Sequence, residues 1–139
     1  MLRVHGTTVA IAGRGVLLRG PSGAGKSDLA LRLIDGGARL VADDQTELMI
    51  RGATVVARAP AVIAGRLEVR GLGIVELPHV ADVPLVLVVD LVPGGEVERL
   101  PAPATESVLG HAVARLALAP FEASAAAKVR LAVDRAYGE

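Results

Sequence analysis

The chain has no cysteine and few aromatic side chains: its 139 residues include one phenylalanine, one tyrosine and no tryptophan. The lack of cysteine excludes disulfides and thiolate metal sites and fits a reducing compartment. Few rings are available on which exposed bases could stack. The 15 basic residues are cancelled by 15 acidic ones, so no net field attracts nucleic acid. We therefore expect no nucleic-acid partner.

Long hydrophobic runs are missing as well. The longest apolar stretch, residues 83–89, is far too short to cross a bilayer, and residues 1–5 lack the apolar segment of a secretory signal. We expect no membrane association and a cytoplasmic location. Hydrophobic residues still make up 52% of the chain, so a core of Val, Leu, Ile and Ala is expected. The length suits a single domain over residues 1–139.

A glycine-rich segment, residues 20–27, is the most informative feature that is present. It consists of Gly20, Pro21, Ser22, Gly23, Ala24, Gly25, Lys26 and Ser27, which fits the phosphate-binding pattern G-x-x-x-x-G-K-[ST]. An apolar run precedes it and a helical pattern follows it, as this motif requires. Backbone N–H groups and the helix N-terminus would surround phosphate oxygens. Lys26 would reach the β- and γ-phosphates, and Ser27 would ligate Mg²⁺.

Short apolar segments separated by glycine predict strands. They cover residues 2–5, 8–12, 16–19, 39–42, 47–50, 54–58, 67–69, 74–77 and 85–89; residues 113–118 fit a strand or a helical turn, and we favour the strand. Helices are expected over 27–35 and 122–137, and a surface loop up to residue 105. The strand at 85–89 is the most hydrophobic and is expected at the centre. Hairpin turns at 13–15 and 51–52 favour a mixed sheet over an all-parallel one.

Three carboxylate positions are candidates for completing a magnesium site. Asp90 ends the apolar run 86–90, as expected of a generic metal acid. The pair Asp43-Asp44 also ends a strand, and Glu68 is the third candidate. Neighbouring side chains on an extended strand point in opposite directions. One Asp of the pair could therefore face a metal or substrate while the other faces backbone donors, although a solvated turn explains the pair equally well.

Four segments together resemble the catalytic domain of bacterial HPr kinase/phosphorylase. They are residues 4–6 (Val-His-Gly), 20–27, 39–44 and 68–74. The last contains the family's signature stretch: Glu68, Val69, Arg70, Gly71, Leu72 and Gly73. The resemblance covers about the first 90 residues well and the remainder loosely. It implies an α/β fold, a P-loop kinase domain of the phosphoenolpyruvate-carboxykinase-like type with a mixed β-sheet and flanking helices.

The same resemblance implies an activity and a set of site residues. The loop would bind ATP, and the enzyme would phosphorylate a serine of HPr, the small phosphocarrier of the phosphotransferase system. The catalytic residues would be His5, Lys26, Asp44 and Arg99, and Mg²⁺ would be served by Ser27 and Glu68. Asp44 would act as the general base, and as the acid when inorganic phosphate reverses the reaction. Asp90 would become a strand-end residue, and assembly as a hexamer is implied.

Two departures from the family pattern qualify these expectations. Typical members carry a further N-terminal domain, whereas this sequence begins just before His5 and resembles the short forms of alphaproteobacteria, in which the phosphotransferase system is regulatory. The family's Pro-Gly-Arg-Asn segment, tied to phosphorolysis, corresponds here to Ala-Pro-Phe-Glu-Ala-Ser at residues 119–124. Kinase activity is therefore the principal expectation.

Two other hypotheses stay open at this point. One is a generic P-loop NTPase or small-molecule kinase that uses Asp90 as its metal acid. The other is a non-enzymatic, ATP-sensing regulatory module that binds a partner such as a sensor kinase. Both share the phosphate loop with the leading hypothesis, so the loop by itself does not separate the three.

Overall fold

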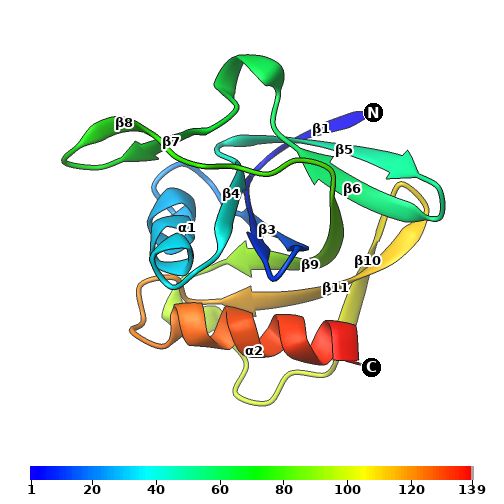
Figure 1. Ribbon diagram of the computed structural model, residues 1–139. Coiled ribbons are helices and arrows are strands. Elements are labelled where there is room, and N and C mark those ends of the chain that lie inside the picture. The colour runs from blue at the N-terminus through cyan, green and yellow to red at the C-terminus, as the bar shows by residue number, and fades with distance from the viewer. Residues whose placement is uncertain (139) are drawn as a thin grey trace.

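The computed structural model describes residues 1–138 as a mixed β-sheet with two helices (Figure 1). The strands are β1 (Leu2–His5), β2 (Thr7–Ile11), β3 (Arg14–Arg19), β4 (Arg39–Ala42), β5 (Gln45–Arg51), β6 (Thr54–Arg58), β7 (Arg66–Val69), β8 (Gly73–Glu76), β9 (Val83–Leu91), β10 (Ala104–Val108) and β11 (His111–Leu118). The helices are α1 (Lys26–Asp35) and α2 (Ala125–Gly138), and η1 (Ala61–Ile63) and η2 (Gly94–Glu96) are short 3₁₀ turns.

Strand β9 lies at the centre of the sheet. It pairs in parallel with β3 and β11 and antiparallel with β6. The main path runs β1-β5-β6-β9-β3-β2-β4, β10 lies beside β11, and β7 and β8 form a separate hairpin. The predicted mixed sheet and the central position of this most hydrophobic strand are both confirmed. The parallel β3–β9 pair places the 20–27 loop at the carboxyl end of the sheet, where ligands bind in open α/β folds.

The core has two parts, one on each side of the sheet. Along β3 the side chains alternate, so Val16 and Leu18 join the first cluster and Leu17 joins the second. Both helices bury their apolar stripes in the first cluster, through Leu29, Ala30 and Leu33 of α1 and Ala125, Val129 and Val133 of α2. This packing fixes the start of α1, and with it the loop, against the sheet. Within residues 1–138, no helix is both long and apolar enough to cross a bilayer.

Two local predictions were wrong. The surface loop was expected to extend to residue 105, but residues 104 and 105 begin β10, a strand that the sequence did not predict and that pairs with β11. Only Val108 of this strand is buried, so the strand carries no apolar alternation to reveal it. The first hairpin turn consists of Ala12 and Gly13, both with positive φ, as in a two-residue type I′ turn; Arg14 already belongs to β3.

A cluster of ion pairs joins β3, β9, β10 and β11. Arg19 Nε donates to Asp90 Oδ1 at 2.8 Å, Arg19 Nη1 to Glu106 Oε2 at 2.6 Å, and Arg115 Nε to Asp90 Oδ2 at 2.7 Å. Burial acts to raise the pKa of Asp90, but the hydrogen bonds and charges of the two arginines outweigh it and hold that pKa below its usual range. The hydrogen bond from Arg19 likewise lowers the pKa of Glu106 despite partial burial.

Replacing Glu106 with Gln should lower the free energy of unfolding by about 1–2 kcal/mol at neutral pH, because Arg19 loses a charged acceptor. The lowered pKa of Glu106 in the folded state means that its contribution is present above about pH 4.3, the ordinary Glu value. The contribution is lost as the pH falls through the folded value. Urea unfolding of the wild type and E106Q should therefore converge in acid. A difference in unfolding free energy between the two proteins that stayed constant with pH would contradict this assignment. The control is Glu98→Gln, at an exposed loop position.

Candidate functional site

The 20–27 loop, the residues after β4 and the β7–β8 hairpin meet around one cavity of about 410 Å³. Its lining consists of Ser22, Gly23, Gly25, Lys26, Ser27, Asp28, Leu31, Asp43, Asp44, Glu68, Val69, Arg70 and Phe121. Three segments that the sequence marked separately therefore share one cavity. The structure also brings His5 to its rim through Asp44, as described below.

The start of α1 is open towards an anion. Gly25 precedes the helix with φ 97° and no side chain caps the first turn, so the N–H groups there keep their capacity to donate. A Cβ at Gly25 would lie 3.0 Å from the ring of Phe121, so both the backbone angle and the close approach require glycine. Free N–H groups and the positive end of the helix dipole together favour a phosphate.

Lys26 carries a buried positive charge, with 7% of the residue exposed. Its Nζ donates to the carbonyl oxygens of Gly20 at 2.7 Å and Pro21 at 3.0 Å. Among the ion pairs of residues 1–138, none involves Lys26. Burying a charge without an opposite charge is costly. The position is thus suited to an anionic ligand that supplies the missing partner.

Asp43 is the structural hub of the site. This buried carboxylate accepts hydrogen bonds on Oδ1 from the hydroxyls of Ser27 at 2.7 Å and Thr7 at 3.0 Å. Its Oδ2 accepts one from the backbone N–H of Glu68 at 3.0 Å. One side chain therefore ties α1, β2 and β7 together and fixes the position of the Ser27 hydroxyl. Sequence reasoning missed Thr7, which no motif marked.

Asp44 and Asp43 have different partners, but the expected alternation along an extended strand is not the reason, because both residues lie in the bend between β4 and β5. The side chain of Asp44 is 66% exposed, and Oδ1 lies 2.9 Å from Nε2 of His5. The backbone of Asp44 is in the left-handed region, with φ 66°, which Asp tolerates better than most residues. Its N–H donates to Thr7 Oγ1 at 3.1 Å, and its carbonyl accepts from the N–H of Gly6 at 2.8 Å. These contacts hold an exposed carboxylate at the rim of the cavity.

Glycine is required at position 6, because the backbone between β1, which ends at His5, and β2 passes very close to β3. A Cβ there would lie 2.9 Å from the carbonyl oxygen of Leu18 and 2.7 Å from Cδ1 of Leu17. We expect Gly6→Ala to cost about 1–3 kcal/mol of unfolding free energy and to lower activity, because the shifted backbone carries the N–H that holds Asp44. Denaturant unfolding and turnover measure the two effects. Gly95→Ala, which meets nothing within 4 Å, is the control; equal behaviour of both variants would refute the close-approach argument.

The charges of the lining indicate how a polyphosphate would be held. The ionisable residues are Asp28, Asp43, Asp44, Glu68, Lys26 and Arg70. Four carboxylates against two cations leave two excess negative charges, which would repel a polyphosphate unless a divalent cation intervened. Within residues 1–138, no group of three His, Asp or Glu side chains forms a metal cage. Mg²⁺ commonly uses one or two carboxylates together with phosphates and water, so oxygens of Ser27 and Glu68 fit it.

Other residues singled out from the sequence lie outside the cavity lining. Both carboxylate oxygens of Asp90 are held by Arg19 and Arg115, so its interpretation as the magnesium acid is wrong. Arg99 is exposed in the segment after η2, and its catalytic role stays a prediction. In the signature stretch, residues 71 and 72 lie in the turn between β7 and β8, and Gly73 begins β8. Sequence reasoning also missed Phe121, the single phenylalanine of the chain.

Comparisons with known sequences match this chain to one family. Residues 1–86 match the sequence profile described as HPr Serine kinase C-terminal domain. The HPr kinase/phosphorylase of Clostridium acetobutylicum is 47% identical over 76 residues, which are 55% of this chain and 25% of that protein. The HPr kinase/phosphorylase of Burkholderia lata is 40% identical over 126 residues, with coverage of 83% of this chain and 39% of that protein.

A solved structure is similar over nearly the whole chain. The Hpr(Ser) kinase/phosphatase from Coxiella burnetii matches with a TM-score of 0.84 and 26% identity, covering 97% of this chain and 89% of that one. By contrast, the chain spans between a quarter and two fifths of the length of the two curated relatives. With the profile match over more than half of its residues, the chain belongs to the family of HPr serine kinase C-terminal domains.

Proposed function

We propose that this chain is an ATP-dependent protein-serine kinase domain, of the phosphoenolpyruvate-carboxykinase-like P-loop type, which phosphorylates an HPr-like phosphocarrier of a regulatory phosphotransferase system in the cytoplasm. One observation carries the proposal. A loop with an unneutralised buried Lys26 and the exposed carboxylate of Asp44 line the same cavity. The names of the relatives support the choice of acceptor.

The residues divide the chemistry between them. Lys26 and the N–H groups at the start of α1 bind the β- and γ-phosphates and stabilise the charge that develops there. Asp44 Oδ1 stays beside His5, which orients the carboxylate. Oδ2 makes no hydrogen bond to any residue in the described part of the chain and accepts the seryl proton. The seryl oxygen forms its bond to the γ-phosphorus as the bond to the bridging oxygen of ADP breaks. In the reverse direction Asp44 returns the proton to the serine.

The proposed reaction uses Mg²⁺ together with ATP. When bound, it neutralises phosphate charge during the transfer. Ser27 and Glu68 would hold it, and Asp43 would keep the Ser27 hydroxyl in position through the 2.7 Å hydrogen bond. Assembly as a hexamer, a catalytic role for Arg99 and a sensor kinase as a second partner are proposed from the family resemblance; light scattering of the purified chain measures the first.

The test of the function is an acceptor panel with γ-labelled ATP and Mg²⁺. It contains an HPr-like protein, the same protein with its acceptor serine replaced by alanine, and an unrelated protein. We expect label on the first protein alone. Label on none, or on the serine-free form, would overturn the proposal. Inorganic phosphate is then added to the labelled product, and release of pyrophosphate would show that the domain also runs the reverse reaction.

A further inference from the structure

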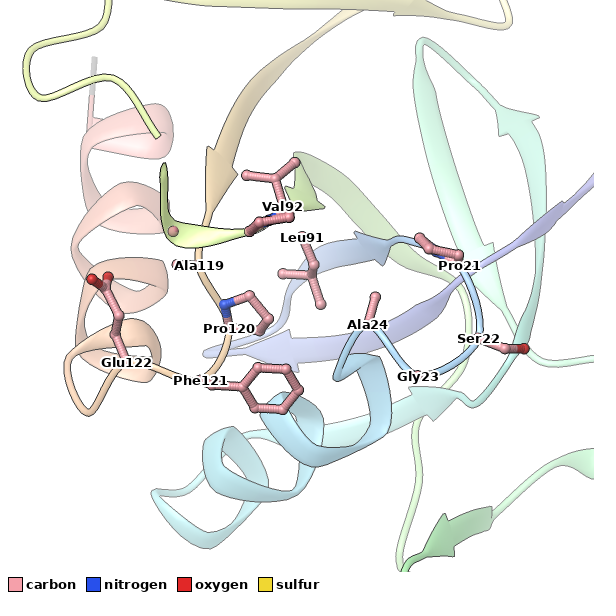
Figure 2. A pocket seen from close by; sticks show the side chains of 12 residues that line it. Pro21, Ser22, Gly23, Ala24, Leu91, Val92, Ala119, Pro120, Phe121 and Glu122 are labelled. Carbon is pink, nitrogen blue, oxygen red and sulfur yellow. The ribbon is translucent and has the colours of Figure 1, made fainter. Parts of the chain in front are cut away.

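A second cavity, of about 690 Å³, shares part of its lining with the first; Figure 2 shows the side chains around it. Ser22, Gly23 and Phe121 line both cavities. The remaining wall comes from Pro21 and Ala24 of the 20–27 loop, from Leu91 at the end of β9 and residues 92–94 after it, and from residues 119, 120 and 122. A ligand with its phosphates at the 20–27 loop could therefore extend directly into the second cavity. The volume is in the range of small-molecule sites.

The wall of this second cavity is almost entirely apolar. Its apolar side chains are those of Pro21, Ala24, Leu91, Val92, Pro93, Ala119, Pro120 and Phe121. The two polar side chains of the lining, Ser22 and Glu122, point away from the space around which Ala24, Leu91, Pro120 and Phe121 gather in Figure 2. The cavity therefore suits a flat group of low polarity, which would make apolar contacts there and meet no charged side chain.

Phe121 is held in a defined position although 71% of it is exposed. The guanidinium of Arg32, on α1, donates to the carbonyl oxygens on both sides of it, from Nη2 to Pro120 and from Nη1 to Glu122 at 3.3 Å. The ring also closely approaches Gly25. An exposed aromatic ring whose segment is held by α1 offers a surface on which a flat group can stack.

We propose that the apolar cavity is the subsite for the nucleobase of the phosphoryl donor, and that the base packs on the ring of Phe121. The inference rests on the proposed function, in which the donor is a nucleoside triphosphate with its phosphates at the 20–27 loop. Because no polar side chain points into the cavity, discrimination between bases is weak. ATP and GTP should bind with affinities that differ by less than about 100-fold.

The single phenylalanine makes a direct observation possible. With ¹³C-labelled phenylalanine the spectrum of the whole chain contains the ring signals of Phe121 alone. Stacking of a base should shift these signals when ADP is added, and pyrophosphate should shift them much less, because it has phosphates but no base. Equal shifts with both ligands would overturn the subsite.

Titration calorimetry with Phe121→Ala gives the second measurement. We expect the Kd of ADP to rise about tenfold and the Kd of pyrophosphate to stay unchanged. Leu131→Ala, which removes an exposed apolar side chain from α2, should change neither. Equal weakening of both ligands would show that the ring only supports the loop, and unchanged ADP binding would place the base elsewhere; either result overturns the subsite.

The two proposals fail in different ways. One outcome is that ADP binds no more tightly than pyrophosphate and that F121A leaves the Kd of ADP unchanged. The base subsite is then wrong and the phosphate site stands. If ADP binds as expected but no acceptor is phosphorylated, the subsite stands and the kinase proposal is wrong. Failure of the wild type to bind either ligand would overturn both.

Discussion

Replacing Lys26 with Met is expected to slow phosphoryl transfer about 100- to 1,000-fold. The substitution keeps a long, flexible chain in the same space and removes only the ammonium group, which is buried and has no carboxylate partner within residues 1–138. Charge placed in advance where a transition state gains charge is among the largest catalytic contributions. The carbonyls of Gly20 and Pro21 lose their donor, which should cost about 1–2 kcal/mol of stability.

Transfer kinetics and denaturant unfolding of K26M separate the two effects. The rate should collapse while the chain stays folded. Lys128→Met is the matched control, since Lys128 lies on α2 in an exposed ion pair with Glu122 and should keep its rate within a few fold. Retention of most of the activity by K26M would remove the lysine from the phosphate site.

Replacing Asp44 with Asn is expected to lower the rate of the chemical step about 100- to 10,000-fold, the usual contribution of general acid–base catalysis. Asn has nearly the same shape, tolerates the left-handed backbone of φ 66°, and can keep a contact with His5. It lacks the carboxylate oxygen that takes the seryl proton. Affinity for ADP should change little, because the proposed phosphate contacts come from the loop and not from Asp44.

Single-turnover transfer and ADP titration of D44N test this assignment. Asp82→Asn is the control, because Asp82 also has a positive φ, 56°, and an ion pair, with Arg51, but does not line the cavity. If D44N transferred phosphate at the wild-type rate, Asp44 would not be the base. If it lost ADP binding as well, the carboxylate would belong to the binding of the nucleotide.

The parts of the fold that could be predicted are those with strong hydrophobic patterning. The run at residues 85–89 is apolar on both faces because β9 is covered on both sides by the two core clusters. Strand β10 was missed because it lies at an edge and presents Thr105, Glu106 and Ser107. Its place depends on ion pairs with residues far away in the chain, such as Arg19, which no local pattern reveals.

The candidate site divides in the same way. Spacing within one segment was enough to predict a phosphate-binding loop at residues 20–27, because the pattern is local. The pair Asp43-Asp44 was found, but which of the two faces the Ser27 hydroxyl depends on how β4 ends and on Thr7 of β2. Asp90 matched the generic pattern of a metal acid. Its carboxylate nevertheless accepts hydrogen bonds from two arginines, which come from β3 and β11. Pairing between distant segments decided both cases.

The most direct test of the central claim is the stoichiometry of ADP and phosphoserine in one reaction mixture. The wild-type chain is incubated with ATP and Mg²⁺, with and without an HPr-like protein, while ADP and phosphoserine are both quantified. The account predicts one ADP for each phosphoserine, and almost no ADP without the acceptor. ADP formed freely without acceptor would indicate a simple NTPase, and bound ATP with no turnover would indicate a sensing module; either result would contradict the kinase.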